Sequence, residues 1–235
     1  MSSYKGHTLF ALIISTILFQ NPLLIALSIT GANIPDFDHD FNKENVYKII
    51  ILGLATFIIL YILKLPSYIG LIIVMLGIIL YFSKHRSFTH SLIGILTLTL
   101  LTSLIMIWGY KLISAVSPVK NSYLIITGLI ILLSFIFINR KVLMIFIPLL
   151  VISTILIPQT HITYFKIAFA LFTGLFSHTV LDSFTPSGVK LLAPISSKKF
   201  YKKFGIAMII LLIPICLIYN IELVKIAAGF LNINI

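Results

Sequence analysis

The stretch SLIGILTLTLLTSLIMIWGYKLI, residues 91–113, decides the fold of this chain. It exceeds the roughly 20 apolar residues that a helix needs to cross a bilayer, and Lys111 is its only charged residue. Six other stretches have the same character or nearly so: 46–63, 67–82, 121–138, 141–157, 162–183 and 205–220. The tail 222–235 is too short to be counted with them. The sequence therefore predicts an all-α protein, a polytopic bundle of transmembrane helices.

The composition of the whole chain also indicates a lipid environment. Of its 235 residues, 60% are apolar and only 10% are charged, whereas a soluble domain has about 25% charged residues. So few charged groups cannot cover a surface that faces water. We expect one integral-membrane domain, residues 1–235, in the cell membrane.

The net charge of +11, from 17 Lys and Arg against 6 Asp and Glu, has two interpretations. In a soluble protein it would suggest a nucleic-acid partner. Here the basic residues lie between apolar stretches, so membrane orientation and contact with anionic lipid explain them better. We expect membrane lipids as partners, no nucleic acid, and no obligate protein partner. The single cysteine, Cys216, excludes a disulfide framework.

Residues 8–34 are long enough for one span, but Gln20-Asn21-Pro22 interrupts them. Proline removes a backbone donor and disfavours helix at the residue before it. One interpretation is a single kinked helix. The favoured one is a re-entrant hairpin of two half-length helices, each about 11–12 residues and about 17 Å long. The hairpin would bring His7 beside Asp36. With the N-terminal region included, the sequence predicts seven or eight membrane helices.

Counting crossings places the loops on two faces of the membrane. Two crossings return the chain to the face it left, so loops separated by an even number of predicted spans share a face. The loops of the first face are 31–45, 83–90, 139–141 and 183–204. The second face has the short connections near 64–66, 114–120 and 158–161. The first face has more Lys and Arg, so the positive-inside rule places it in the cytoplasm. Phosphate binding would produce the same bias.

Three polar clusters lie on the first face. The first spans Gly31 to Asp40 and holds Asp36, Asp38, His39 and Asp40. Its alternate carboxylates and imidazole offer ligands suited to Zn, Mn or Fe. It is equally well explained as a solvated acidic turn. A bound cation would relieve the repulsion between Asp36 and Asp38. Asp40 is the weakest candidate.

The second cluster is His85-Arg86-Ser87-Phe88-Thr89-His90-Ser91, at a predicted helix start that Ser87 or Thr89 would cap. Arg86 has the geometry to bind a phosphate bidentately. A basic interfacial loop is the alternative. The lysines 198, 199, 202 and 203 either attract an anionic lipid headgroup or serve only to orient the protein in the membrane.

The third cluster joins His178 and Asp182, which are four residues apart and so share one face of a helix. They are placed to bind one cation, or else Asp182 orients His178 or caps the next turn. Ionisable groups near a membrane core are costly and tend to be functional. His161 lies on the second face and is interpreted as an interfacial histidine.

These motifs resemble the LexA-regulated, membrane-bound, metal-dependent hydrolases, a family similar at a distance to zinc phospholipase C. The matching segments are Gly6-His7, 35–39, 85–91 and 177–194, in that order, with Ser87 where glycine is common. The resemblance implies hydrolysis of a phospholipid or other membrane phosphoester with one or two divalent ions, Zn or else Mn or Fe. The metal ligands it implies are His7, Asp36, Asp38 or His39, His85, His90, His178 and Asp182. Asp36, Asp38 and Arg86 are the candidate catalytic residues.

Two rival functions are weighed against a metal-dependent hydrolase. A phosphohistidine lipid phosphatase needs an arginine before its H-x-x-x-D and an Arg-Pro motif, and residues 162–177 contain no arginine, nor does the chain contain Arg-Pro. A non-enzymatic sensor, scaffold or transporter is the other. A transporter needs polar ligands near mid-span, whereas the candidates here lie at one edge. An enzyme is the favoured prediction.

Overall fold

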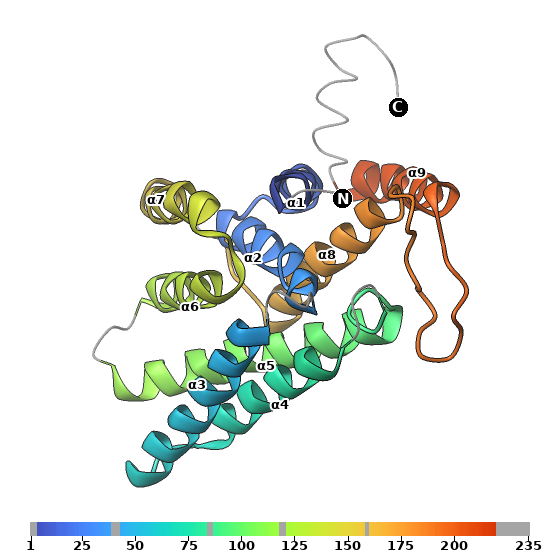
Figure 1. The fold of residues 1–235 in the computed structure, drawn as a ribbon. Helices are drawn as coiled ribbons and strands as arrows, with labels where there is room; N and C mark the ends of the chain where they lie inside the picture. The colour runs from blue at the N-terminus through green and yellow to red at the C-terminus, as the bar shows by residue number, and fades with distance from the viewer. Residues whose placement is uncertain (1–3, 39–42, 84–86, 118–120, 158–159, 220–235) are drawn as a thin grey trace.

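The computed structural model describes the backbone of residues 4–38, 43–83, 87–117, 121–157 and 160–219, and their side chains except at 38, 43 and 216–219. Within this part of the chain the regular elements are helices (Figure 1), and the only strand-like pairing is an isolated antiparallel bridge between Val189 and Phe200. The elements are α1 (Tyr4–Leu18), α2 (Pro22–Ala32), the 3-10 turn η1 (Pro35–Asp38), α3 (Lys43–Ile62), α4 (Tyr68–Phe82), α5 (Leu92–Val116), α6 (Ser122–Phe137), α7 (Arg140–Leu156), α8 (Tyr164–Asp182) and α9 (Lys202–Tyr219).

The seven apolar stretches predicted from the sequence coincide with α3 to α9, so the all-α prediction is confirmed. Three helices are long and apolar enough to cross a membrane by length and composition: Glu44–Ile62, Leu92–Val116 and Tyr164–Asp182. The other apolar helices are shorter, and α4, for example, has 15 residues. Helix length alone therefore does not fix the number of crossings.

The break at Gln20-Asn21-Pro22 separates two helices, so the single kinked helix is wrong and the hairpin is present. Pro22 is the first residue of α2, where its missing N–H costs nothing. The Asn21 side chain caps this helix by accepting a hydrogen bond from the Leu23 N–H at 2.9 Å. At the open end of the hairpin, Asn33 Nδ2 donates to Thr8 Oγ1 at 3.3 Å. The two arms therefore meet again at the level of His7.

The hairpin is deeper than predicted. The first arm has 15 residues and the second has 11, so α1 is about 22 Å long at about 1.5 Å per residue. At the tip, the buried Asn21 donates through Nδ2 to the backbone oxygen and Oγ1 of Thr160, both at 3.2 Å. Thr160 lies just before α8, so the tip reaches the end of the bundle where α8 begins. A turn held by protein in this way is the kind that a bilayer tolerates.

Contacts between helix ends confirm that the short connections gather at one end of the bundle. Lys111 Nζ, near the end of α5, lies 4.4 Å from the ring centroid of Trp108 and 5.9 Å from that of Tyr164. The Tyr68 ring packs edge-on against Trp108 at 4.7 Å. Lys166 also donates to the His161 carbonyl at 3.0 Å. The end of α2, the start of α5 and the end of α8 lie at the other end, which is where the candidate site forms.

Glycines allow α2 and α8 to approach backbone to backbone. A Cβ on Gly174 would collide with the Ser28 carbonyl oxygen, and one on Gly31 would lie 2.8 Å from the Leu171 carbonyl oxygen. Small residues at helix interfaces are the usual means of close packing in membranes. This contact sets the end of α2 against the last turns of α8, and Figure 1 shows the two helices crossing near the middle of the molecule.

Candidate metal centre

Five ionisable side chains converge at the end of the bundle where α8 finishes. They come from four separate parts of the chain: α1, η1, the turn before α5, and α8. The five are His7, Asp36, His90, His178 and Asp182. The prediction that the three polar clusters meet is confirmed for these described residues, and His7 joins them because the hairpin returns the chain.

The first group contains His90, His178 and Asp182. His90 Nε2 lies 3.2 Å from His178 Nε2 and 3.2 Å from Asp182 Oδ2, and His178 Nε2 lies 3.7 Å from the same oxygen. Zinc holds nitrogen and oxygen ligands at about 2.0–2.2 Å in a tetrahedron, so its ligand atoms are about 3.3–3.6 Å apart. The three distances are close to the edges of such a tetrahedron. The geometry therefore fits a small divalent cation.

The second group contains His7, Asp36 and His178. His178 Nε2 lies 3.6 Å from Asp36 Oδ1, and the His7 ring stacks on the His178 ring with centroids 3.7 Å apart. Asp182 joins the two groups, because its Oδ1 lies 3.5 Å from His7 Nε2 while its Oδ2 faces His90. His178 Nε2 belongs to both groups but can bind only one ion. The arrangement thus fits one ion, or two ions with Asp182 between them.

Hydrogen bonds from outside the groups orient two of the imidazoles. His178 Nδ1–H donates to the Ala32 carbonyl oxygen at 2.6 Å, so in the neutral ring Nε2 carries the lone pair that faces the cluster. Thr89 Oγ1 lies 2.9 Å from His90 Nδ1. Partners of this kind fix ring tautomers at metal sites. Without a cation and with His178 neutral, the short His90–His178 contact is a hydrogen bond that His90 Nε2–H donates to His178 Nε2.

Most of the ionisable side chains in this cluster are buried, so water does not stabilise their charges. His7 and Asp182 are each 2% exposed, and His90 and His178 are fully buried. A buried carboxylate needs a compensating charge or donors. Three imidazoles and two carboxylates form the nitrogen and oxygen ligand set that suits Zn, Mn or Fe. Asp36 is the exception, with 18% of its side chain exposed, so this is the open side of the cluster.

The turn before α5 is built differently from the prediction. Ser91, rather than Ser87 or Thr89, caps the helix, because its Oγ accepts from the Gly94 N–H at 3.0 Å. The Thr89 hydroxyl is therefore available to His90. Leu92 N–H donates to the Leu191 carbonyl oxygen at 2.9 Å, which ties this turn to the segment after α8. Ser87 and Thr89 were the natural candidates because the predicted helix began near His90.

Several predicted site residues lie outside the described part of the chain. They are His39, Asp40, His85 and Arg86, and the side chain of Asp38 joins them. Their roles stay predictions. His161 lies at the opposite end of the bundle, as predicted. Two orienting groups were missed in the sequence: Thr89, which had been assigned to the cap, and the Ala32 carbonyl, for which a sequence carries no signal.

The fold and the site define a class: a helical membrane protein with buried histidines and aspartates that could hold a metal ion. The chain belongs to the YdjM inner membrane protein family, whose model matches residues 1–233. This membership, together with the apolar helices, makes it an integral protein of the cell membrane. No curated protein and no solved structure matches the chain.

Proposed function

We propose that this protein is an integral-membrane, metal-dependent hydrolase acting on a phospholipid or another membrane-associated phosphoester. The observation that carries the proposal is the convergence of His7, Asp36, His90, His178 and Asp182 with spacings close to those of a coordination shell. The resemblance of the motifs to LexA-regulated membrane hydrolases supports the same reaction. A metal transporter is disfavoured because the cluster lies at one end of the bundle rather than at mid-span.

A bound divalent cation would supply a Lewis acid that lowers the pKa of a coordinated water and neutralises charge on a phosphoryl oxygen. The residues of this chain have distinct parts in such a hydrolysis. His90, His178 and Asp182 would hold the cation, and the Ala32 carbonyl would keep His178 in the tautomer that offers Nε2 to it. Asp36, on the open side, would accept the proton of the attacking water as the water oxygen bonds to phosphorus, and the leaving alkoxide would take a proton from solvent as its bond to phosphorus breaks. Arg86 and Asp38 remain candidates from the sequence.

We further propose that α3 to α9 each cross the bilayer and that the α1–α2 hairpin inserts from the side of the site. Basic residues support a cytoplasmic site, because Arg140, Lys141 and Lys190 lie on that side of the predicted topology with the lysines 198–203. Cysteine accessibility measures this directly. In a Cys216→Ser background, Ser196→Cys is expected to react with a permeant reagent only, and Lys64→Cys also with an impermeant one. The reverse labelling would overturn the orientation.

Metal analysis of purified protein tests the cluster itself. Wild type should retain about one or two equivalents of a divalent metal, because five ligands are arranged for it. His178→Ala removes the ligand that the two groups share, and its metal content is expected to fall below a tenth of wild type. His161→Ala, at the far end, is the matched control and should retain all of it. Full metal in His178→Ala would exclude the site as described.

Hydrolysis is tested with a panel of phospholipids and soluble phosphoesters. Release of phosphate or headgroup should stop with a chelator, return on addition of Zn or Mn, and be abolished in Asp36→Asn. Release that survives chelation would overturn the metal-dependent mechanism. A protein that holds stoichiometric metal but cleaves nothing would instead support the non-enzymatic alternative, a membrane sensor.

A further inference from the structure

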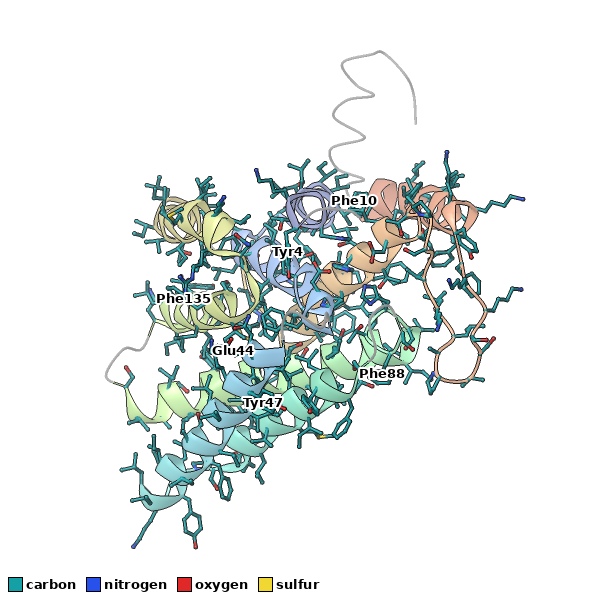
Figure 2. All side chains as sticks on the ribbon, in the orientation of Figure 1. Tyr4, Phe10, Glu44, Tyr47, Phe88 and Phe135 are labelled. Carbon is teal, nitrogen blue, oxygen red and sulfur yellow. The ribbon has the colours of Figure 1, made fainter. Side chains whose placement is uncertain are left out.

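A pocket of about 590 Å³ opens between four parts of the chain. Its walls come from the start of α1, from η1, from α3, and from the junction of α6 and α7. Figure 2 labels Tyr4 and Phe135 on two of these walls, and Glu44 at the start of α3. Tyr4 lies three residues before His7 on α1, and Phe37 directly follows Asp36. Two lining residues are thus close in sequence to members of the cluster, but none of the five cluster residues is itself among the residues that line the pocket.

The pocket changes character along its length. At one end the exposed side chains of Lys48 and Arg140 contribute positive charge. One helical turn away on α3 is Leu52, which is 46% exposed, and one turn before Asn139 is Phe135, which is 61% exposed. Such exposed apolar residues face lipid in a membrane bundle. The lining also includes the buried rings of Phe37 and Phe137, which pack edge-on with centroids 4.9 Å apart.

The two cations are available to a ligand. Lys48 pairs only with Glu44 among described carboxylates, at 2.9 Å, and both side chains are largely solvent-exposed, so this pair contributes little. Arg140 has no carboxylate partner among the described residues. A guanidinium can bind phosphate through two parallel hydrogen bonds. Positive charge at the rim and apolar surface one turn away match the polarity of a lipid with an anionic headgroup.

We propose that this pocket binds an anionic phospholipid from the bilayer, with its phosphate between Lys48 and Arg140 and its acyl chain along Leu52 and Phe135. The inference rests on the proposed function in one respect: the bound lipid would be the substrate whose phosphoester reaches the cluster. Binding itself needs no turnover, so it can be measured separately.

The test uses the full chain reconstituted in phosphatidylcholine bilayers with a chelator present. Because Trp108 is the only tryptophan, Leu52→Trp in a Trp108→Phe background places a single fluorophore in the pocket. Ile59→Trp is the matched control, since Ile59 is 55% exposed on the same helix but outside the pocket. Quenching of the tryptophan fluorescence is compared between two brominated lipids, phosphatidylglycerol and phosphatidylcholine, each added at the same mole fraction.

The Leu52→Trp indole is expected to be quenched preferentially by the anionic lipid, with a preference of about fivefold for each cation near the headgroup. Ile59→Trp should show no preference. Adding Arg140→Gln and Lys48→Gln should abolish the preference, whereas Lys141→Gln, beside Arg140 but outside the pocket, should retain it. Equal quenching at both positions, or a preference that survives the double substitution, would overturn the inference.

The two proposals fail in different ways. Selective lipid binding by a protein that hydrolyses nothing would support the lipid-binding proposal and contradict the hydrolase proposal. Chelator-sensitive hydrolysis with an unchanged KM in Arg140→Gln would support the hydrolase proposal and contradict the proposal that the pocket is its substrate site.

Discussion

The α2–α8 pair and the α3–α4 pair both pack backbone to backbone at a glycine, but the two contacts have different roles. Gly174 on α8 and Gly70 on α4 each face the backbone of a partner helix so closely that a Cβ would collide with it, at Ser28 and at Phe57 respectively. The α2–α8 contact is buried and holds His178 against the Ala32 carbonyl. The α3–α4 pair presents its outer surface to lipid, with Ile58 and Ile59 more than half exposed.

The difference shows that close helix packing does not by itself mark a functional site. Both pairs achieve backbone contact through glycine, but only α2 and α8 end in polar groups that meet a third and a fourth element. In α2–α8 the packing sets the Ala32 carbonyl against the ring of the cluster residue His178. In α3–α4 it makes a wall with exposed apolar residues, and α3 alone of the two helices lines the pocket.

The largest expected effect comes from adding one methyl group to each pair. Gly174→Ala forces α2 and α8 apart and should destabilise the protein by about 3 kcal/mol or more. It should also lower the metal content of the protein that still folds, because Ala32 then moves relative to His178. Gly70→Ala should cost a similar stability but leave metal content unchanged. Thermal unfolding in detergent and metal analysis measure the two quantities.

Equal metal loss in both glycine variants would show that the two helix pairs are not separate in function. Equal metal retention would show that α2–α8 packing does not set the ligand geometry.

A smaller effect is expected from the hydroxyl that orients His90. Thr89→Val keeps the shape of the side chain but removes the group 2.9 Å from His90 Nδ1. Loss of an orienting partner typically weakens metal binding by about 10–100-fold. Thr97→Val is the control, since that hydroxyl donates to the Ile93 carbonyl within α5. Competition with a chelator of known affinity gives both dissociation constants, and an unchanged value for Thr89→Val would argue against this role.

The smallest effect is expected at the tip of the hairpin. Asn21→Ala removes a helix cap, worth about 0.5–2 kcal/mol, together with the hydrogen bonds to Thr160. Asn121→Ala removes a comparable cap from α6 at an exposed position. Asn21→Ala should therefore destabilise the protein more than Asn121→Ala, by about 1 kcal/mol. Identical unfolding temperatures would show that the tie to Thr160 adds nothing.

Much of the fold could be predicted because lipid imposes simple rules on sequence. Long apolar runs predicted α3 to α9, and the break at Asn21-Pro22 predicted the hairpin. The membership of His7, Asp36, His90, His178 and Asp182 in one cluster could also be predicted, because counting crossings places three of the four segments on one face. The depth of the hairpin could not, since hydropathy does not say whether 15 residues cross or return.

The orienting contacts could not be predicted for a different physical reason. The Ala32 carbonyl is a backbone group, and its meeting with His178 depends on the crossing of two helices that are remote in sequence. The role of Thr89 depends on which neighbouring hydroxyl caps α5, and Ser87, Thr89 and Ser91 are all good capping residues. The pocket proposed to bind lipid is likewise assembled from residues on α1, η1, α3 and the α6–α7 junction.

The contact between Ala32 and His178 also has a consequence for how the protein is made. The two residues are 146 positions apart, which corresponds to about 7–30 s of synthesis at about 5–20 residues per second. During that interval the N-terminal hairpin has been synthesised, but its partner helix does not yet exist. The cluster can form only when α8 has been inserted. Metal capture would therefore be a late event, restricted to chains whose synthesis has passed the eighth helix.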